Sequence, residues 1–331
     1  MGQIYTQAFL HALERGLRDN VHLWGLSPGT DISLLNISEN ATFLARDPEA
    51  ASPIVLRVHR PDYHTRAEIH SELSWIEDLR KEAVALVPAP VAMTGGQRIG
   101  AIKAWGETRD VVAFEYMPGK EPLPSDNLAK GFHQLGAISA RLHVHAKSWQ
   151  RPHGFIRKTW NFDTTVGRNP HWGTWRNAMA LTPTGEAVLA RVCNLLEKRL
   201  RNFGDSPNRF GLIHADLRLA NLLIHVDRIG LIDFDDCGFS WFAFDFAAAI
   251  SFFETDPAIA ALQDAWCTGY RSVAPLDPEV VAEMSTFIML RRLQLTAWIA
   301  THSETPTAQE LGEAYTDGTL DIAERYLSER T

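Results

Sequence analysis

The 331-residue sequence lacks the features of a secreted, membrane-bound or nucleic-acid-binding protein. Its three cysteines are far apart and form no CxxC pair, which excludes a disulfide framework and a cysteine-rich zinc site and indicates a reduced, cytoplasmic protein. No apolar run approaches the roughly 18–20 residues needed to span a bilayer. The net charge is −8, whereas nucleic-acid binders are usually basic. We expect neither a membrane nor a nucleic acid as partner, and the oligomeric state stays open.

The expected elements divide the chain into a strand-rich part and a helix-rich part. Apolar periodicity predicts strands at 32–37, 41–45, 54–59, 99–104, 111–116, 211–213, 222–224 and 229–232. It predicts helices at 3–18, 67–86, 128–146, 187–203, 243–253, 257–272, 278–302 and 307–329. We expect Asp126 to cap the helix over 128–146 and Gly204 to end the helix over 187–203. The fold class is therefore α+β, with a small N-terminal antiparallel sheet and one helix in residues 1–117 and a larger, mainly helical lobe in residues 118–331.

The polar residues of 213–236 carry the clearest chemical pattern. His214 and Asp216 are followed by Asn221, and Asp233 comes after a hairpin, at the end of an apolar strand. Phosphoryl transfer needs a carboxylate that accepts or orients the hydroxyl proton, and oxygen ligands that hold Mg²⁺ on the phosphates. The spacing therefore predicts Asp216 as the catalytic residue and Asn221 and Asp233 as the Mg²⁺ ligands. The alternative is a plain β-hairpin whose turns carry these polar residues.

This stretch resembles the catalytic loop of the aminoglycoside phosphotransferase and choline kinase superfamily, the small-molecule branch of the protein-kinase-like fold. Ala215 stands where the superfamily usually has glycine. The resemblance implies that His214 supports the loop and that Asp245, at a later helix start, braces it. Within the superfamily, the segments 57–61, 214–217 and 232–236 look most similar to the bacterial stress-response kinase and the type II homoserine kinase.

The same resemblance implies a nucleotide site in residues 1–117. The segment 38–43, which includes Asn40, would cover the nucleotide, although a plain hairpin turn fits it equally. Residues 114–117, with Glu115 and Met117, would form the hinge whose backbone reads the adenine edge. The expected nucleotide is ATP, with GTP as the alternative.

Arg57 marks a departure from the superfamily, because it stands where the phosphate-binding lysine usually lies. Arginine keeps the charge but is bulkier and flatter than lysine. Glu72, 15 residues on, is the expected partner of Arg57 at a partly exposed site, and Glu68 is the alternative partner. In a competing interpretation Arg57 faces solvent at a sheet edge and another cation, such as Lys103, binds the phosphates.

The segment 205–256 has an acidic surplus that favours a cationic acceptor. It contains nine acidic and three basic residues, and Asp235 and Asp236 are candidate substrate contacts. Trp160 and Trp172 are further candidates, because tryptophan faces bind cations. The competing interpretations are a solvated acidic surface and ordinary core packing of the tryptophans.

The sequence as a whole predicts an ATP- and Mg²⁺-dependent phosphotransferase. Its acceptor would be a hydroxyl of a small, cationic molecule such as an amino alcohol, an amino acid or an amino sugar. Two alternatives stay open: a protein Ser/Thr kinase of the stress-response type, and a nucleotide-binding pseudokinase scaffold. The scaffold is favoured only by the substitution at Arg57.

Overall fold

In the computed structural model, which describes residues 6–37 and 40–330, the chain forms two compact units. The first unit contains residues 1–118 and 150–157, and the second contains 119–149 and 158–331. The return of 150–157 to the first unit has no signal in the sequence. It rests on tertiary hydrogen bonds, because the N–H of Ile156 donates to Ser71 Oγ at 3.0 Å and Arg157 Nη1 donates to the carbonyl of Glu68 at 3.0 Å.

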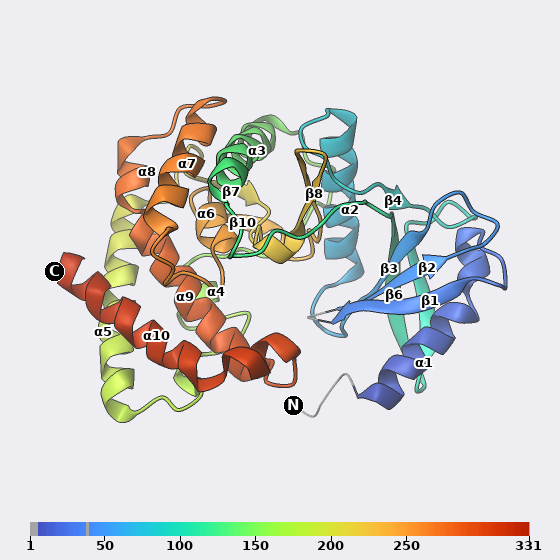
Figure 1. The fold of residues 1–331 in the computed structure, drawn as a ribbon, viewed down its shortest axis with the longest axis horizontal. Helices are drawn as coiled ribbons and strands as arrows, with labels where there is room; N and C mark the ends of the chain where they lie inside the picture. Colours follow the sequence, from blue (N-terminus) through green and yellow to red (C-terminus); the bar gives the residue numbers. More distant parts are fainter. Residues whose placement is uncertain (1–5, 38–39, 331) are drawn as a thin grey trace. The chain divides into compact units, whose positions relative to one another are not determined.

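The first unit is built on a six-stranded antiparallel sheet (Figure 1). Its strands are β1 (Asp31–Ile37), β2 (Ala41–Arg46), β3 (Ile54–Val58), β4 (Pro90–Val91), β5 (Ile99–Ala104) and β6 (Glu107–Glu115). The spatial order is β1-β2-β3-β6-β4, and β5 also pairs with β6. Arg57 therefore lies on a strand with neighbours on both sides, which rules out the sheet-edge interpretation.

Two longer helices and one 3-10 turn complete the first unit. Helix α1 (Gln7–Arg18) packs with the 3-10 turn Val21–Trp24 against the sheet, and its core contributions include Phe9 and Leu13. Helix α2 (Arg66–Lys81) begins with a capping box, in which Thr65 Oγ1 accepts from the N–H of Glu68 and Glu68 accepts from the N–H of Thr65. Lysine 81 ends α2 five residues before the predicted end.

The second unit is mainly helical and contains two short antiparallel strand pairs. Its helices are α3 (Ala129–Ser148), α4 (Phe162–Thr165), α5 (Pro183–Phe203), α6 (Phe244–Ala249), α7 (Ile259–Arg271), α8 (Pro278–Ala282), α9 (Met284–Thr301) and α10 (Pro306–Arg330), with 3-10 turns at Trp175–Asn177 and Leu219–Asn221. Strand β7 (Phe210–Ile213) pairs with β10 (Gly238–Trp241), and β8 (Leu222–His225) pairs with β9 (Arg228–Leu231). The predicted fold class, α+β with a small antiparallel sheet and a larger helical part, is confirmed.

Helix α9 is the central helix of the second unit. Figure 1 shows it beside α6 and α10, and it also packs on α5 and on the turn Trp175–Asn177. Nearly every position along it is buried, polar ones included. No helix in the described part of the chain has the length and apolarity to cross a bilayer.

Two predicted details of the second unit are wrong. Asp126 does not cap α3, because its carboxylate accepts from the N–H of Leu123 at 2.8 Å and Leu128 occupies the N-cap position. The single helix expected over 278–302 is divided at Glu283, whose carboxylate accepts from Arg199. The Asp126 contact is a local side chain–backbone hydrogen bond of the kind that replaces a helix cap, whereas the Glu283 contact comes from α5.

Candidate active site

The loop that contains Asp216 lies between strand β7 and the β8–β9 hairpin of the second unit. Strand β7 leads into residues 214–218, the turn Leu219–Asn221 follows, and β8 and β9 then return the chain to Asp233. The N–H of Ile232 donates to the carbonyl of Asn221 at 3.0 Å. The structure therefore brings Asp216, Asn221 and the segment of Asp233 together, as the spacing predicted.

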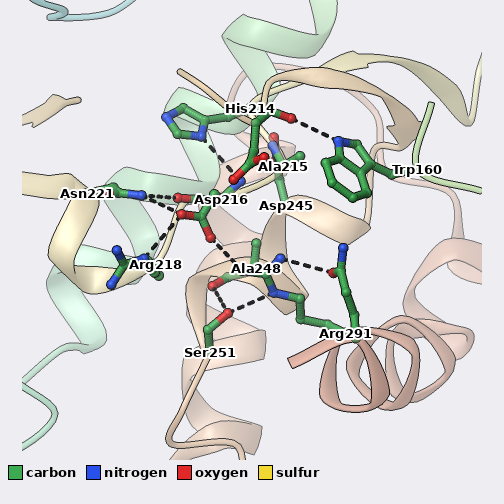
Figure 2. Close-up of polar contacts among 12 residues, drawn as sticks. Trp160, His214, Ala215, Asp216, Arg218, Asn221, Asp245, Ala248, Ser251 and Arg291 are labelled. Carbon is green, nitrogen blue, oxygen red and sulfur yellow. Dashed lines mark hydrogen bonds and ion pairs between the residues drawn. The ribbon is translucent and has the colours of Figure 1, made fainter. Parts of the chain in front are cut away.

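The carboxylate of Asp216 is held from two sides, as Figure 2 shows. Its Oδ2 accepts from Asn221 Nδ2 at 2.7 Å and from Arg218 Nε at 3.2 Å, and its Oδ1 accepts from Arg291 Nη2 at 2.5 Å. Burial raises the pKa of Asp216, but the charges of Arg218 and Arg291 outweigh burial and bring the pKa below its ordinary value. Asp216 is therefore ionised at neutral pH and can only accept hydrogen bonds.

Asn221 and Asp233 fit a magnesium ion by their donor atoms. Because the Nδ2 of Asn221 donates both to the carbonyl and to the carboxylate of Asp216, the amide oxygen is the atom that remains for a cation. No three His, Cys, Asp or Glu side chains in the described residues converge on a metal position. Mg²⁺ keeps several waters and takes its other ligands from one or two side chains and from phosphates.

Two buried residues support the backbone of this loop. His214 Nε2 donates to the carbonyl of Ile232 at 3.1 Å, and its Nδ1 accepts from the N–H of Asp216 at 3.3 Å. Burial lowers the pKa of His214, which keeps the ring neutral in this tautomer. The Oδ1 of Asp245 accepts from the N–H of Ala215 at 2.8 Å. Both side chains therefore hydrogen-bond to the backbone of the loop that contains Asp216.

A buried histidine extends this support into the helices. His143 on α3 shares a 3.0 Å hydrogen bond with Asp245 Oδ2 and a 3.1 Å hydrogen bond with the hydroxyl of Tyr270 on α7. Burial lowers the pKa of His143, so the neutral ring donates from Nε2 to the carboxylate and accepts from the tyrosine at Nδ1. A chain of hydrogen bonds thus runs from Tyr270 through His143 and Asp245 to Ala215.

Ala215 has a backbone conformation that glycine adopts more easily. Its φ of 66° lies in the left-handed region, which costs an L-residue with a side chain about 1–2 kcal/mol. Asp233 is also left-handed, with a φ of 59°. The loop is therefore held in a strained form by its hydrogen bonds, and strain of this kind is frequent at functional sites.

The predicted substrate contacts in the second unit are all buried. The indole N–H of Trp160 donates to the carbonyl of Asp236 at 2.9 Å, and the ring meets Trp172 edge-on at 5.4 Å. The ring of Trp172 faces a cation of the chain itself, the guanidinium of Arg291, 5.0 Å from the ring centroid. Trp160 therefore supports the loop that carries Asp235 and Asp236, whose exposed fractions are 4% and 7%.

In the first unit, Arg57 and Glu72 form a buried ion pair. Arg57 Nη2 donates to both carboxylate oxygens of Glu72, at 2.8 and 2.6 Å, and the guanidinium lies over the ring of Phe114. Their exposed fractions are 4% and 0%, so the expectation of a partly exposed pair is wrong. Glu68, the alternative partner, caps α2 instead, and Lys103 is exposed.

The other first-unit predictions lie at the ends of strands. Asn40 Oδ1 accepts from the N–H of Arg60 at 3.0 Å, while the preceding residues 38–39 of the predicted covering loop lie outside the described residues. The N–H of Glu115 donates to the carbonyl of Ala89 at 2.9 Å, and its side chain is exposed. Met117 is half-buried in the hinge segment.

Comparison with known proteins decides the class of this site. The sequence profile of the phosphotransferase enzyme family matches residues 32–276, about three quarters of the chain. The chain belongs to the phosphotransferase enzyme family. The predicted enzyme class, an ATP-dependent phosphotransferase, is confirmed with it.

Three relatives illustrate how this phosphotransferase compares with known proteins. The solved structure of the microcompartment-associated aminopropanol kinase is 40% identical, with a TM-score of 0.87 over 95% of this chain and 97% of that one. Amicoumacin kinase of Bacillus subtilis (strain 168) is 23% identical over 252 residues, which are 73% of this chain and 72% of the relative. The structure of amicoumacin kinase hAmiN in complex with AMP-PNP, Ca²⁺ and Ami shares the fold, at 22% identity and a TM-score of 0.76 over 93% of each chain.

Sequence reasoning missed three residues of the phosphotransferase site. Arg218 lies two positions after Asp216, so its place inside the loop was a usable signal. His143 and Arg291 carry no local signal, because each sits in a helix far along the chain from the loop it supports. Arg291 also lies beyond residue 276, where the match to the family ends.

Proposed function

We propose that this phosphotransferase transfers the γ-phosphate of ATP, used with Mg²⁺, to the hydroxyl of a small amino alcohol. The observation that carries the proposal is the 40% identity, over 95% of the chain, with an aminopropanol kinase. Such an acceptor places an ammonium group beside the reacting hydroxyl, and this charge suits the acidic segment 205–256.

The structure narrows which acids of this segment would meet an ammonium group. Five of them have other surroundings, because two are exposed and three accept hydrogen bonds from structural partners: Asp205 and Asp227, and Asp245, Glu254 and Asp256. We assign Asp216 to the hydroxyl and Asp233 to the metal. Asp235 and Asp236 then remain as the acids that would bind the ammonium, and their burial would strengthen the attraction.

In the proposed mechanism, Asp216 accepts or orients the proton of the acceptor hydroxyl as the oxygen attacks the γ-phosphate in line, while the bond from the γ-phosphorus to the bridging oxygen breaks and ADP leaves. Its ionised state, maintained by Arg218 and Arg291, keeps it ready as an acceptor. Asn221 and Asp233 would hold Mg²⁺, which neutralises charge on the phosphates when it is bound. His214 and Asp245 fix the loop backbone, so that Asp216 keeps its position during the reaction.

In the first unit, Arg57 would contact the phosphates, and Glu72 would hold the guanidinium in place. The N–H groups of Glu115 and Tyr116 donate to carbonyls within the first unit. We therefore assign recognition of the adenine edge to the backbone of Met117. Recognition of this kind needs no particular side chain, and ATP is the nucleotide we propose.

A screen of ADP release from Mg·ATP tests the proposal. The acceptors are the aminopropanol isomers, ethanolamine, choline, homoserine and an aminoglycoside, with propan-2-ol as the matched control that lacks the ammonium group. We expect an aminopropanol or ethanolamine to give the highest kcat/KM, at least about 10²-fold above propan-2-ol, because the neutral alcohol has no ammonium group to meet the buried carboxylates. Turnover confined to neutral or anionic acceptors would contradict the proposed acceptor class.

A further inference from the structure

Arg291 is a buried cation in the middle of α9, and the family match ends before this helix begins. Its exposed fraction is 1%. A buried charge is costly unless it is paired and fully hydrogen-bonded. The hydrogen-bond partners of Arg291 therefore indicate the role of this buried side chain.

Each nitrogen of the Arg291 guanidinium has a different partner. Its Nε donates to Ser251 Oγ at 3.0 Å, its Nη1 donates to Gln294 Oε1 at 3.1 Å, and its Nη2 donates to Asp216 Oδ1 at 2.5 Å. The ring of Trp172 covers the guanidinium from one side. Two neutral acceptors and an aromatic ring therefore fix the plane of the guanidinium. Its third nitrogen, Nη2, points at the carboxylate of Asp216 (Figure 2).

The two oxygens of Asp216 consequently have separate sets of partners. Oδ2 is held by Arg218 and Asn221, which belong to the same loop as Asp216. Oδ1 is held by Arg291, which lies 75 residues further along the chain. Within residues 6–37 and 40–330, only the contact from α9 ties the carboxylate to an element outside its own loop, and this contact restrains rotation of the carboxylate against the body of the second unit.

Arg292, the next residue of α9, is also a buried arginine, but it does not contact Asp216 or its loop. Arg292 donates to Glu254 at 2.6 Å, to Thr319 Oγ1 at 2.8 Å and to the carbonyl of Tyr315 at 2.8 Å. These partners join α9 to α10 and to the segment after α6, away from the catalytic loop. Arg292 is therefore a matched internal control for Arg291.

We propose that Arg291 is a positioning residue for phosphoryl transfer, which orients the Asp216 carboxylate toward the acceptor hydroxyl from outside the catalytic loop. The inference rests on the proposed function, since it assigns Asp216 to the hydroxyl. Loss of Arg291 would let the carboxylate rotate, and a displacement of about 1 Å at a reacting group can lower the rate about 10²-fold.

The test compares Arg291→Met, Arg291→Lys and Arg292→Lys with the wild-type enzyme, using the acceptor that wild type turns over fastest. We expect Arg291→Met to lower kcat about 10²-fold with the KM for ATP and for the acceptor within threefold, because the ground-state contacts remain. Arg291→Lys should recover kcat to within tenfold of wild type, since lysine restores the charge without the fork. Arg292→Lys should keep kcat within twofold.

Two results would overturn the inference: kcat within threefold of wild type in Arg291→Met, or a fall of kcat in Arg292→Lys as large as the fall in Arg291→Met. If Arg291→Met fails to fold, Ser251→Ala removes the acceptor of Nε, and we expect kcat three- to tenfold lower. An unchanged kcat in that variant would also overturn the inference.

Asp216→Asn, measured in parallel, separates this inference from the proposed function. Wild-type turnover in Asp216→Asn would remove Asp216 from the mechanism, and the role of Arg291 with it. Loss of turnover in Asp216→Asn together with wild-type turnover in Arg291→Met would overturn the Arg291 inference alone. If wild type uses none of the screened acceptors, ADP release to water supplies the rate for the same comparison, so a wrong acceptor leaves the test of Arg291 in place.

Discussion

Each unit of the molecule contains a buried arginine–carboxylate pair at a predicted functional position. Arg57 and Glu72 in the first unit are 15 residues apart and connect a strand to the next helix. Arg291 and Asp216 in the second unit are 75 residues apart and connect the catalytic loop to α9. The difference shows that spacing predicts a pair formed by consecutive elements, whereas a pair formed by tertiary packing leaves no local pattern.

Burial gives the two pairs the same energetic character. Removing one partner of a buried pair leaves an uncompensated charge and typically costs 3–5 kcal/mol, far more than loss of an exposed pair. Truncation of either arginine therefore mixes a stability effect with a catalytic one. Variants that keep the charge, or that change only the carboxylate oxygen, separate the two effects better than alanine does.

The largest effect is expected from Asp216→Asn, which keeps the shape of the side chain and removes its negative charge. We expect kcat to fall about 10²–10⁴-fold, because the amide cannot accept the hydroxyl proton, with nucleotide affinity near wild type. Steady-state kinetics and calorimetry of Mg·ATP binding check this. If kcat stays near wild type in the folded variant, the Arg291–Asp216 pair has only a structural role and is no longer comparable with Arg57–Glu72 as a functional pair.

Much of the site was predictable because it is local in sequence. Asp216 and Asn221 belong to the loop between β7 and β8, and Asp233 follows the β8–β9 hairpin, so their spacing carries the geometry. Arg57 and Glu72 were predictable for the same reason, as members of consecutive elements. The left-handed backbone of Ala215 could also be anticipated from the glycine that the superfamily usually has there.

The rest of the site depends on packing that no window of sequence contains. His143 shares a hydrogen bond with Asp245, which lies 102 residues further along the chain. Arg291 is a charged residue within a largely apolar helix, and only the folded structure shows that it pairs with Asp216. Strand β10 was missed because four residues show too little alternation.

Glycines 136 and 269 had no assigned role, yet a Cβ at either would lie within 2.0 Å of a carbonyl oxygen, because α3 and α7 approach at their backbones.

The second prediction concerns metal binding by Asp233, in contrast to Asp216, whose loss should leave nucleotide affinity near wild type. We expect Asp233→Ala to weaken Mg²⁺-dependent binding of ATP by at least about 10–100-fold, because the alanine supplies no oxygen ligand. Calorimetry with and without Mg²⁺ measures the difference. Asp233→Ala that binds Mg·ATP as tightly as wild type would show that the metal is held elsewhere.

The third prediction moves to the first-unit pair. We expect Arg57→Ala to lower kcat/KM for ATP at least tenfold, about 1.4 kcal/mol, and also to lower the melting temperature, because Glu72 stays buried without its partner. Arg57→Lys should recover part of both. Glu72→Gln is the control that removes the carboxylate charge and keeps the arginine. An unchanged kcat/KM in Arg57→Lys and in Arg57→Ala would make this pair structural, unlike the pair at Asp216.

The smallest effect is expected at Glu68, one helical turn from Glu72, which the sequence left as an alternative partner of Arg57. The structure makes it the reciprocal half of the α2 capping box. Burial raises the pKa of Glu68, but hydrogen bonds from His64 and Thr65 outweigh burial and lower the pKa to about 2. The fold therefore favours the ionised carboxylate.

Because this pKa is lower in the folded chain than its ordinary value of 4.5, the stabilisation by Glu68 is complete above about pH 5 and is lost as the pH falls toward 2. Glu68→Gln can still accept at the cap but has no charge near the helix N-terminus, so we expect a loss of about 0.5–1 kcal/mol at pH 7. The gap between wild type and variant should close between pH 5 and pH 2, and kcat/KM for ATP should not change. Denaturant unfolding across this pH range provides the measurement. A tenfold loss of kcat/KM in Glu68→Gln would mean that Glu68, like Glu72, helps to position Arg57. The Arg57–Glu72 pair would then not act alone.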